Sequence, residues 1–334
     1  MAEKPLRIVY YLGFAMIDYT MFYKTTLSLD EPWPSEARWD VFLSAFTAAE
    51  RLRWVFDKAN AVEKHWLVFP QYQFLHTDHP AGSVFASDSV SEADFIQLFW
   101  DSKLKGIDNT ASICIDTTGF IRPFLMFLVR WLMVRGFRIF EAIYSEPVTY
   151  ARREETRFSD EMIEQVRQVA GFEGNHLTDN SRDVLIIGSG YDHELIARVA
   201  ENKDQARKIQ IFGFPSLRAD MYQENVLRAH RAEEAVGGLR ESADLFFAPA
   251  NDPFVTASVL QQIVKDLHSR NSLGNLYLSP LATKAQVLGF ALYYVTECRN
   301  TPTSIIFPFS PTYNQETSKG IARIWKYTVE LPAP

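Results

Sequence analysis

From about residue 112 onward, the chain repeats one pattern of hydrophobic and polar positions. A short run rich in Ile, Val, Leu and Phe is followed by polar residues, Gly or Pro, and then by a segment whose apolar positions have helical spacing. Successive runs begin about 24 to 44 residues apart, which is the length that a βαβ crossover needs. The seven runs cover residues 112–115, 140–143, 184–187, 208–212, 244–248, 275–279 and 304–308.

These runs lack the alternation of polar and apolar residues that marks a strand with one solvated face. Continuous apolar strands are typical of a parallel sheet that helices cover on both faces. The sequence therefore predicts an α/β fold with a Rossmann-like, doubly wound, mainly parallel sheet in which all seven runs lie side by side. The helices between them are expected at residues 121–135, 192–202, 219–235, 253–268 and 284–298.

Residues 1–111 do not follow this pattern. They are expected to form an N-terminal mixed α/β lobe, either separate from the main sheet or continuous with it, ahead of a Rossmann-like parallel α/β domain at residues 112–334. The long interval 148–182 predicts a surface excursion or flap. The expected elements of the lobe are strands at 6–12 and 65–74 and helices at 37–59 and 91–103.

The composition is that of a folded globular protein. Hydrophobic residues make up 47% and charged residues 22% of the chain, which excludes a disordered or coiled-coil class. The net charge is −7 and no basic block is present, so binding of long nucleic acid is not expected. The only cysteines, Cys114 and Cys298, provide no framework for a disulfide-rich secreted protein, and a reducing cytoplasm is expected.

Two apolar segments call for comparison with membrane or export signals. Residues 120–134 are only about fifteen in number and contain Arg122 and Arg130, so they fall short of the roughly twenty apolar residues of a membrane span. They are expected to form a buried helix. The apolar N-terminal segment is interrupted by tyrosines and Asp18 and precedes no small-residue cleavage site. Neither a signal peptide nor membrane association is therefore expected.

Polar residues gather where the predicted strands end. A parallel sheet binds ligands beyond the carboxyl ends of its strands, where loops diverge and helix N-termini point into a crevice. The candidate catalytic residues at this edge are Asp116, Glu146, Asp192 and His193. The candidate ligand-binding residues are Thr117, Thr118, Gly188, Ser189, Gly190, Tyr191, Asp252, Ser279, Thr283 and Lys284.

Among the loops at this edge, the most informative is the glycine loop that follows the run at 184–187. Two glycines flank Ser189, so the backbone can turn sharply and approach a ligand closely, while the next helix presents N–H groups to an anion. The loop is not a G-x-G-x-x-G fingerprint, because His193 takes the place of the third glycine. It also lacks the Gly-Lys-Ser/Thr ending of a P-loop.

Two interpretations of this loop stay open. It is either a phosphate or ribose loop with Tyr191 as a stacking partner, or a tight turn in which Asp192 caps the following helix. Histidine is the side chain suited to acid or base chemistry near neutral pH, so His193 is a candidate for that role. The alternative is that His193, on the first turn of a helix, simply faces solvent.

The other candidates have the same two interpretations. Lys284 follows Thr283 at a helix start and can reach an anion there, or it is a solvent-facing lysine. Asp116, with two threonines after it, can accept a ribose hydroxyl or a proton, or it caps a helix. Glu146 is a general base or a solvated turn residue, and Asp252 is a ligand contact or a helix cap.

Metal and nucleophile motifs are absent from the sequence. The histidines show no H-x-x-x-H spacing, and the segment 76–79 is the only candidate for a metal loop. Ser189 does not stand in a G-x-S-x-G elbow, which argues against a serine hydrolase. No metal site is predicted and no cofactor is identified.

The expected plan resembles Rossmann-type nucleotide-binding folds, including sensor domains that bind small nucleotides, although a likeness of fold assigns no residue roles. The first hypothesis is a cytoplasmic protein that binds a nucleotide or another phosphorylated, ribose-containing small molecule. The second is a hydrolase or glycosyl transferase that acts on such a ligand through strand-end carboxylates. The third is a non-catalytic regulatory or structural subunit, with a protein partner or a homo-oligomer left open.

Overall fold

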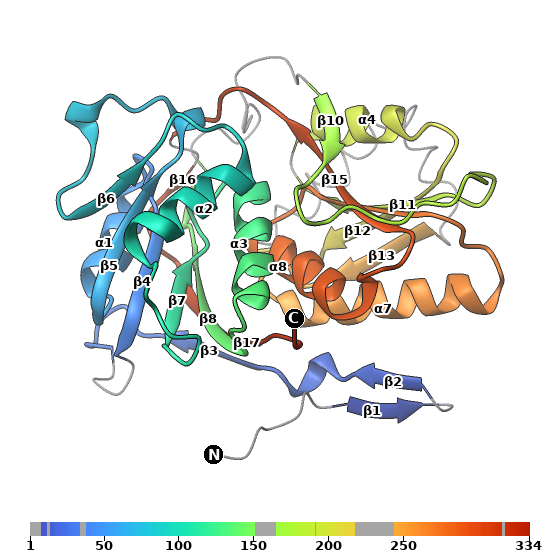
Figure 1. The fold of residues 1–334 in the computed structure, drawn as a ribbon, viewed down its shortest axis with the longest axis horizontal. Helices are drawn as coiled ribbons and strands as arrows, with labels where there is room; N and C mark the ends of the chain where they lie inside the picture. The colour runs from blue at the N-terminus through green and yellow to red at the C-terminus, as the bar shows by residue number, and fades with distance from the viewer. Residues whose placement is uncertain are drawn as a thin grey trace.

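The computed structural model describes residues 8–11, 14–33, 38–150, 165–190, 192–217, 244–315 and 318–334. In this part of the chain, two large mixed sheets of mostly parallel strands pack with six α-helices (Figure 1). The predicted α/β class is therefore confirmed.

The first sheet has seven strands in the order β3-β17-β8-β7-β4-β5-β6. The strands β4 to β8 run parallel, and β17 lies antiparallel between β8 and β3. Its strands are β3 (Tyr23–Leu27), β4 (Trp39–Ala45), β5 (Ala61–Val68), β6 (Ser83–Ala86), β7 (Ile113–Asp116), β8 (Ile139–Glu146) and β17 (Arg323–Glu330), and its helices are α1 (Glu50–Lys58), α2 (Glu92–Lys103) and α3 (Arg122–Val134).

The second sheet has six strands in the order β10-β15-β14-β11-β12-β13. All pairs are parallel except that of β10 with β15. Its strands are β10 (Gln165–Gln168), β11 (Val184–Ser189), β12 (Arg207–Gly213), β13 (Leu245–Ala248), β14 (Leu276–Pro280) and β15 (Thr303–Phe309), and its helices are α4 (His193–Asn202), α7 (Pro253–Ser269) and α8 (Lys284–Tyr293). A π-helical turn at Tyr294–Cys298 extends α8.

Residues 39–146 and 184–309, which we call the first and second halves, have the same topology. The order β8-β7-β4-β5-β6 in the first half corresponds strand by strand to β15-β14-β11-β12-β13 in the second. Helices α1, α2 and α3 hold the chain positions that α4, α7 and α8 hold in the other half. The fold is thus an internal repeat of topology, although no sequence repeat is visible.

Helices α3 and α8 form the junction between the halves and lie side by side at the centre of the molecule (Figure 1). The main core joins both sheets with α2, α3, α4, α7 and α8, whereas a second core packs α1 on the other face of the first sheet. Because α3 has neighbours on nearly every side, its apolar residues surround the helix. This confirms that residues 120–134 form a buried helix.

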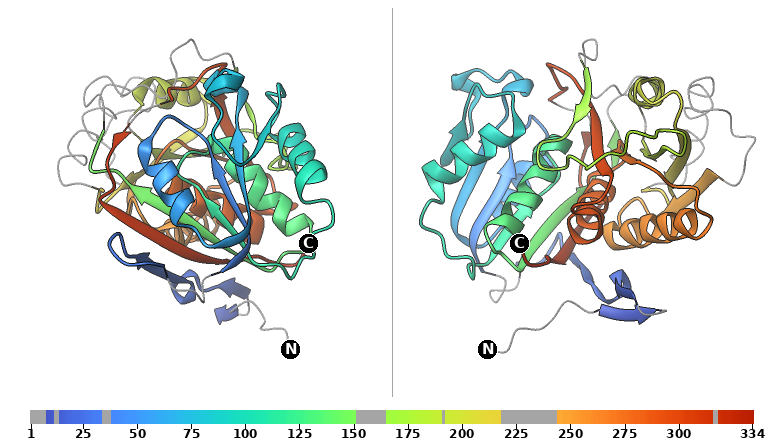
Figure 2. Two further views of the ribbon diagram at one scale, coloured as in Figure 1. Left: turned by 90° about the vertical axis from the view of Figure 1, so that its left-hand side faces the viewer. Right: turned by 45° about the vertical axis from the view of Figure 1, so that its right-hand side comes forward.

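Three short elements complete the described chain. The hairpin of β1 (Ile8–Tyr11) and β2 (Phe14–Ile17) lies at the periphery, apart from both large sheets (Figure 2). The strands β9 (Thr149–Tyr150) and β16 (Ser318–Lys319) pair with each other, and short 3-10 turns occur at Tyr19–Met21, Pro70–Tyr72 and His76–Asp78. No helix in the described ranges is long and apolar enough to cross a membrane.

All seven predicted runs form strands, but the expectation that they share one sheet is wrong. The first two runs are β7 and β8 and belong to the first sheet, while the other five are β11 to β15 in the second. The spacing pattern is the same in both halves, so it does not show where one sheet ends. Strands from both sides of residue 111 share the first sheet, which makes the N-terminal lobe continuous with it. The division into domains at that residue stays a prediction.

The helix predicted at 37–59 is also wrong in its first part. Residues 39–45 form β4, a buried central strand, and α1 begins only at Glu50. No Gly or Pro separates the two elements, so the apolar positions of the strand and helix merge into one pattern. The helix expected at 219–235 and residues 151–164 of the excursion expected at 148–182 lie outside the described residues. The described part of that interval includes β10, which pairs with β15 as an edge strand of the second sheet.

Candidate functional site

A cavity opens at the carboxyl edge of the first sheet, against the start of α8 from the second half. Its volume is about 730 Å³ when the part open to solvent is included. Residues 313–315 and Ser318, which precede β17 in the chain, also line it. The lining residues are Thr47, Ala49, Arg51, Leu52, Tyr72, Thr118, Gly119, Ile121, Arg122, Tyr144, Thr283, Lys284, Tyr313, Asn314, Gln315 and Ser318.

Three cationic side chains, from Arg51, Arg122 and Lys284, line this cavity, and the described lining includes no Asp or Glu. They come from the first turns of α1, α3 and α8 respectively. Arg122 and Lys284 are the first residues of helices that correspond in the two halves. The cavity therefore gathers positive charge from both halves of the molecule.

Arg51 is only 9% exposed, yet its hydrogen bonding is incomplete. Its Nη1 donates to the carbonyl oxygen of Ser145 at 2.8 Å. Its buried Nε has no partner among the described residues. The hydroxyl of Ser318, on the same cavity, is also buried without a partner in the described chain. Two buried polar groups of lining residues thus stay unsatisfied in the described chain.

The amine of Lys284 also lacks a polar partner in the described chain. Its side chain is partly buried, and in the described ranges it has neither a hydrogen bond nor an ion pair. Burial, together with the positive charges of Arg122 and Arg51, lowers the pKa of the amine well below its usual value. A positive charge on this amine is therefore poorly compensated by the described residues of the cavity.

Arg122 joins the two halves at the edge of the cavity. Its Nε and Nη2 donate to the carbonyl oxygen of Ala282 at 3.1 and 3.0 Å, so the loop before α8 is fixed against the start of α3. Tyr72, Tyr144 and Tyr313 line the same space, and the Tyr72 hydroxyl donates to the carbonyl oxygen of Gly119 at 2.9 Å. Burial raises the pKa of both Tyr72 and Tyr313, which keeps these hydroxyls neutral.

The helix starts around the cavity differ in their capping. The N-cap positions of α1 and α3 are Ala49 and Ile121, and neither supplies a side-chain cap. By contrast, Asp192, Asp252 and Thr283 cap α4, α7 and α8. Uncapped helix starts retain N–H groups and the positive end of the helix dipole for an anion. Both uncapped starts named here belong to the cavity lining.

Among the predicted site residues, Thr118, Thr283 and Lys284 line this cavity together. Thr283 caps α8 and its hydroxyl donates to the carbonyl oxygen of Ala250. The Thr118 hydroxyl lies 3.0 Å from the Ser145 hydroxyl and accepts from the Ser145 N–H at 3.0 Å. These contacts position the residues without occupying the centre of the cavity.

Asp116 lies behind the lining rather than in it. Its carboxylate is fully buried and accepts from the Ser44 hydroxyl at 3.0 Å and from the Thr118 N–H at 3.1 Å. Burial raises the pKa of this carboxyl, although the hydrogen bonds and the charge of Arg51 oppose the rise. Thr117 uses its hydroxyl to donate to the carbonyl oxygen of Ile143 at 2.9 Å.

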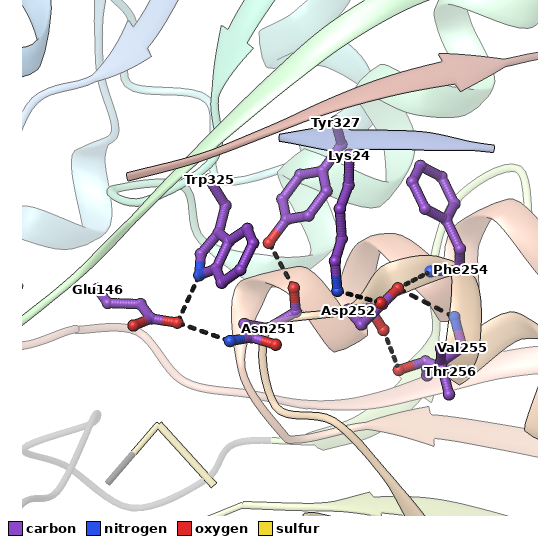
Figure 3. A network of polar contacts seen from close by, with 9 residues as sticks. All are labelled: Lys24, Glu146, Asn251, Asp252, Phe254, Val255, Thr256, Trp325 and Tyr327. Atoms are coloured by element: carbon purple, nitrogen blue, oxygen red, sulfur yellow. Dashed lines mark hydrogen bonds and ion pairs between the residues drawn. The ribbon is translucent and has the colours of Figure 1, made fainter. Parts of the chain in front are cut away.

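Glu146 and Asp252 belong to a network that joins the halves (Figure 3). The buried Glu146 accepts from the Trp325 indole at 2.6 Å and from the Asn251 amide at 2.9 Å. Asp252 caps α7 by accepting from two backbone N–H groups and also pairs with Lys24 of β3. Both carboxylates therefore have structural partners, and neither lines the cavity.

The glycine loop of the second half packs tightly against the loop before α8. A Cβ on Gly190 would lie 2.2 Å from the Leu281 carbonyl oxygen, and one on Gly188 would lie 2.9 Å from the ring of Phe290. The Ser189 hydroxyl donates to Gln210 Oε1 at 2.7 Å. These glycines permit close packing between loops.

The remaining predicted residues lie elsewhere in the second half. Asp192 caps α4 by accepting from a backbone N–H, and His193 is the partly exposed first residue of that helix. Ser279 is buried in β14, and its hydroxyl has no partner among the described residues. Tyr191 lies outside the described residues. The cavity does not include these positions.

Arg51 and Arg122 are absent from the predicted set. Recognising β4 and α1 as separate elements would have placed Arg51 on a first helical turn at a strand end, the criterion that selects Lys284. No group of three or more potential metal ligands occurs in the described part of the chain. Comparison with known proteins finds no matching family model, curated protein or solved structure.

Proposed function

We propose that this protein binds a phosphorylated small molecule, a nucleotide or another ribose phosphate, with the phosphate held beside Arg51 in the cavity that Lys284 also lines. The observation that carries the proposal is the Arg51 guanidinium, which is nine-tenths buried with its Nε unpartnered on a cation-lined cavity. A buried donor without an acceptor costs about 1–3 kcal/mol, and an anion in the cavity removes that cost.

The uncapped starts of α1 and α3 support the same ligand chemistry. Backbone N–H groups and guanidinium donors together suit the oxygens of a phosphate, which accepts several hydrogen bonds at once. The position at the carboxyl edge of parallel strands is where open α/β sheets bind ligands. We interpret the repeated strand order as Rossmann-like and doubly wound, and we place the protein in the cytoplasm, where its two buried thiols stay reduced.

The enzymatic alternative depends on Asp116. A hydrolase or glycosyl transferase needs a carboxyl group poised to exchange a proton, and the raised pKa of Asp116 next to the lining residue Thr118 favours this residue over the other candidates. Turnover of a nucleotide or glycoside that disappears in Asp116→Asn, while ligand binding persists, would support it. Without such turnover, a sensor or regulatory subunit is the better description.

The binding proposal is tested by calorimetric and thermal-shift titration with mono-, di- and oligonucleotides, ribose 5-phosphate and inorganic phosphate. We expect Arg51→Gln to weaken binding about tenfold or more, because a hydrogen bond to a charged group contributes about 1.5–3 kcal/mol. Arg53→Gln is the matched control, since Arg53 lies on the same helix but is exposed and outside the lining. Equal losses in the two variants, or no binding of any phosphate compound, would refute the proposal.

A further inference from the structure

The Lys284 amine combines three properties that are rarely found together. It opens into a cavity, it has no hydrogen bond or ion pair in the described chain, and the described lining offers no carboxylate to hold it as an ammonium. The guanidinium groups of Arg51 and Arg122 line the same space. Like charges nearby and partial burial both favour the neutral amine, as the lowered pKa of Lys284 indicates.

A neutral amine in a protein cavity is a nucleophile toward carbonyl carbon. Lysines that form imines are activated by desolvation or by a neighbouring cation, and both are present here. The arginines cannot compete for the same role because they stay protonated. The cavity therefore separates two tasks, anion binding by the guanidinium groups and nucleophilic attack by the amine.

We propose that Lys284 forms an imine with an anionic aldehyde or ketone whose phosphate or carboxylate group lies beside Arg51. The inference rests on the proposed function, since the same cavity must hold the anionic group. It narrows the ligand class to molecules in which the anion and a carbonyl carbon can reach Arg51 and Lys284 together.

The reaction needs no oxidant or reductant. The nitrogen lone pair of Lys284 forms a bond to the carbonyl carbon while the π electrons of the carbonyl move to oxygen, and a proton passes from nitrogen to that oxygen. The carbinolamine then loses its hydroxyl group together with the second nitrogen proton as water, which leaves the C=N bond. The hydroxyls of Thr118 and Tyr313 line the cavity and can carry these protons.

The test uses pyridoxal 5′-phosphate as the anionic aldehyde and pyridoxal as the same aldehyde without the phosphate. Each is incubated with the full chain, the imine is reduced with borohydride, and peptide mapping by mass spectrometry locates the modified lysines. We expect saturable modification of Lys284 ahead of the other lysines, at an aldehyde concentration about tenfold or more lower for the phosphate form. Inorganic phosphate should protect Lys284 from modification.

Variants separate the amine from the anion site. Lys284→Arg should bind inorganic phosphate but lose the adduct, and Arg51→Gln should lose the preference for the phosphorylated aldehyde. Lys103→Arg, which changes an exposed lysine of α2, should leave Lys284 labelling unchanged. Circular dichroism checks that each variant is folded.

Two results overturn the inference. One is modification of exposed lysines to the same extent as Lys284, and the other is phosphate binding by calorimetry without any adduct at Lys284. Failure of the proposed function appears separately, as the absence of phosphate binding in the calorimeter.

Discussion

The two halves of the molecule share a strand order but use their carboxyl edges differently. In the second half, side chains cap the starts of α4, α7 and α8, and the glycine loop is filled by the loop before α8. In the first half, α1 and α3 begin without side-chain caps, and each has an arginine in its first turn. Among the described residues, these three helix starts of the second half are therefore capped by side chains, whereas two helix starts of the first half are not.

This difference shows that topology alone does not locate a binding site. Both halves have strands, loops and helix starts in the same order, so an argument from strand ends selects both edges equally. The distinction lies in the local chemistry, namely which helix starts already have an acceptor and which buried donors lack one. The single contribution of the second half to the described cavity is the start of α8, with Thr283 and Lys284.

The largest effects are expected from two glycines at equivalent loop contacts. In the first half, a Cβ on Gly119 of the β7–α3 loop would lie 2.3 Å from the carbonyl oxygen of Ala45 at the end of β4. In the second half, a Cβ on Gly190 of the β11–α4 loop would lie 2.2 Å from the carbonyl oxygen of Leu281 in the β14–α8 loop. The same two loops touch in both halves, but the glycine comes from the opposite loop.

Because the opposing atoms are backbone oxygens, we expect Gly119→Ala and Gly190→Ala each to lower the free energy of unfolding by about 3 kcal/mol. Only Gly119 lines the cavity, so only Gly119→Ala should also weaken phosphate binding. Urea denaturation and calorimetry measure the two effects. Gly106→Ala is the control, since nothing lies within 4 Å of its Cβ position. Unchanged stability in both loop variants would contradict the equivalence of these contacts.

The sequence predicts the second half well because its elements have clear boundaries. The helix from Pro253 is preceded by Asp252, and the helix from Lys284 by Thr283, so a capping residue marks each start. In the first half the same logic fails, since Ala49 does not signal a helix start and β4 runs into α1. Because β4 is not recognised as a strand, Arg51 is not predicted to lie near a strand end.

The cavity itself could not be predicted by any local pattern. It exists because α3 packs on α8 and brings the starts of these two helices together. Arg122 and Ala282, which a hydrogen bond joins there, are 160 positions apart in the chain. The residue types at Thr118 and Lys284 are readable from the sequence. Their proximity depends on the packing of the halves, which periodicity does not encode.

An intermediate effect on anion affinity is expected from a change of pH, because pH changes the protonation of Lys284. Burial and the neighbouring arginines lower its pKa, and a bound anion would raise it by compensating the charge, so binding would take up a proton between the two pKa values. Affinity should therefore fall as pH rises toward 10.5, the usual pKa of a lysine, by up to about tenfold per pH unit. The other ionisable groups that line the cavity are Arg51, Arg122 and three tyrosines, Tyr72, Tyr144 and Tyr313. Burial raises the pKa of Tyr72 and of Tyr313, which keeps these two hydroxyls neutral in this range.

Sulfate is the suitable probe, because it does not titrate in this range. Calorimetry in buffers with different ionisation enthalpies measures the proton uptake directly. In Lys284→Met, both the proton uptake and the pH dependence should disappear. A pH dependence that persists in this variant would assign the titration to another group.

The same shift affects stability in the opposite sense. The unfolded chain binds more protons at Lys284 than the folded chain between the lowered pKa and the usual one, so the free energy of unfolding rises with pH across that window. In Lys284→Met, this part of the pH dependence of the free energy of unfolding should vanish. The measurement is urea denaturation of both the original protein and the variant across this pH range.

The smallest effect is expected from adding a side-chain cap to α1, whose N-cap residue Ala49 supplies none. In Ala49→Ser, a hydroxyl can accept from a first-turn N–H of α1, as Asp192 does in α4, and should stabilise the fold by about 0.5–1 kcal/mol. The backbone N–H that donates to this hydroxyl is then no longer available to donate to an anion. Phosphate affinity should therefore fall while the free energy of unfolding rises. Most substitutions that weaken a site by disturbing the fold move both quantities in the same direction. Opposite signs in Ala49→Ser, measured by denaturation and calorimetry on one preparation, would show that the open helix start is what the first half contributes to binding, and parallel changes would contradict it.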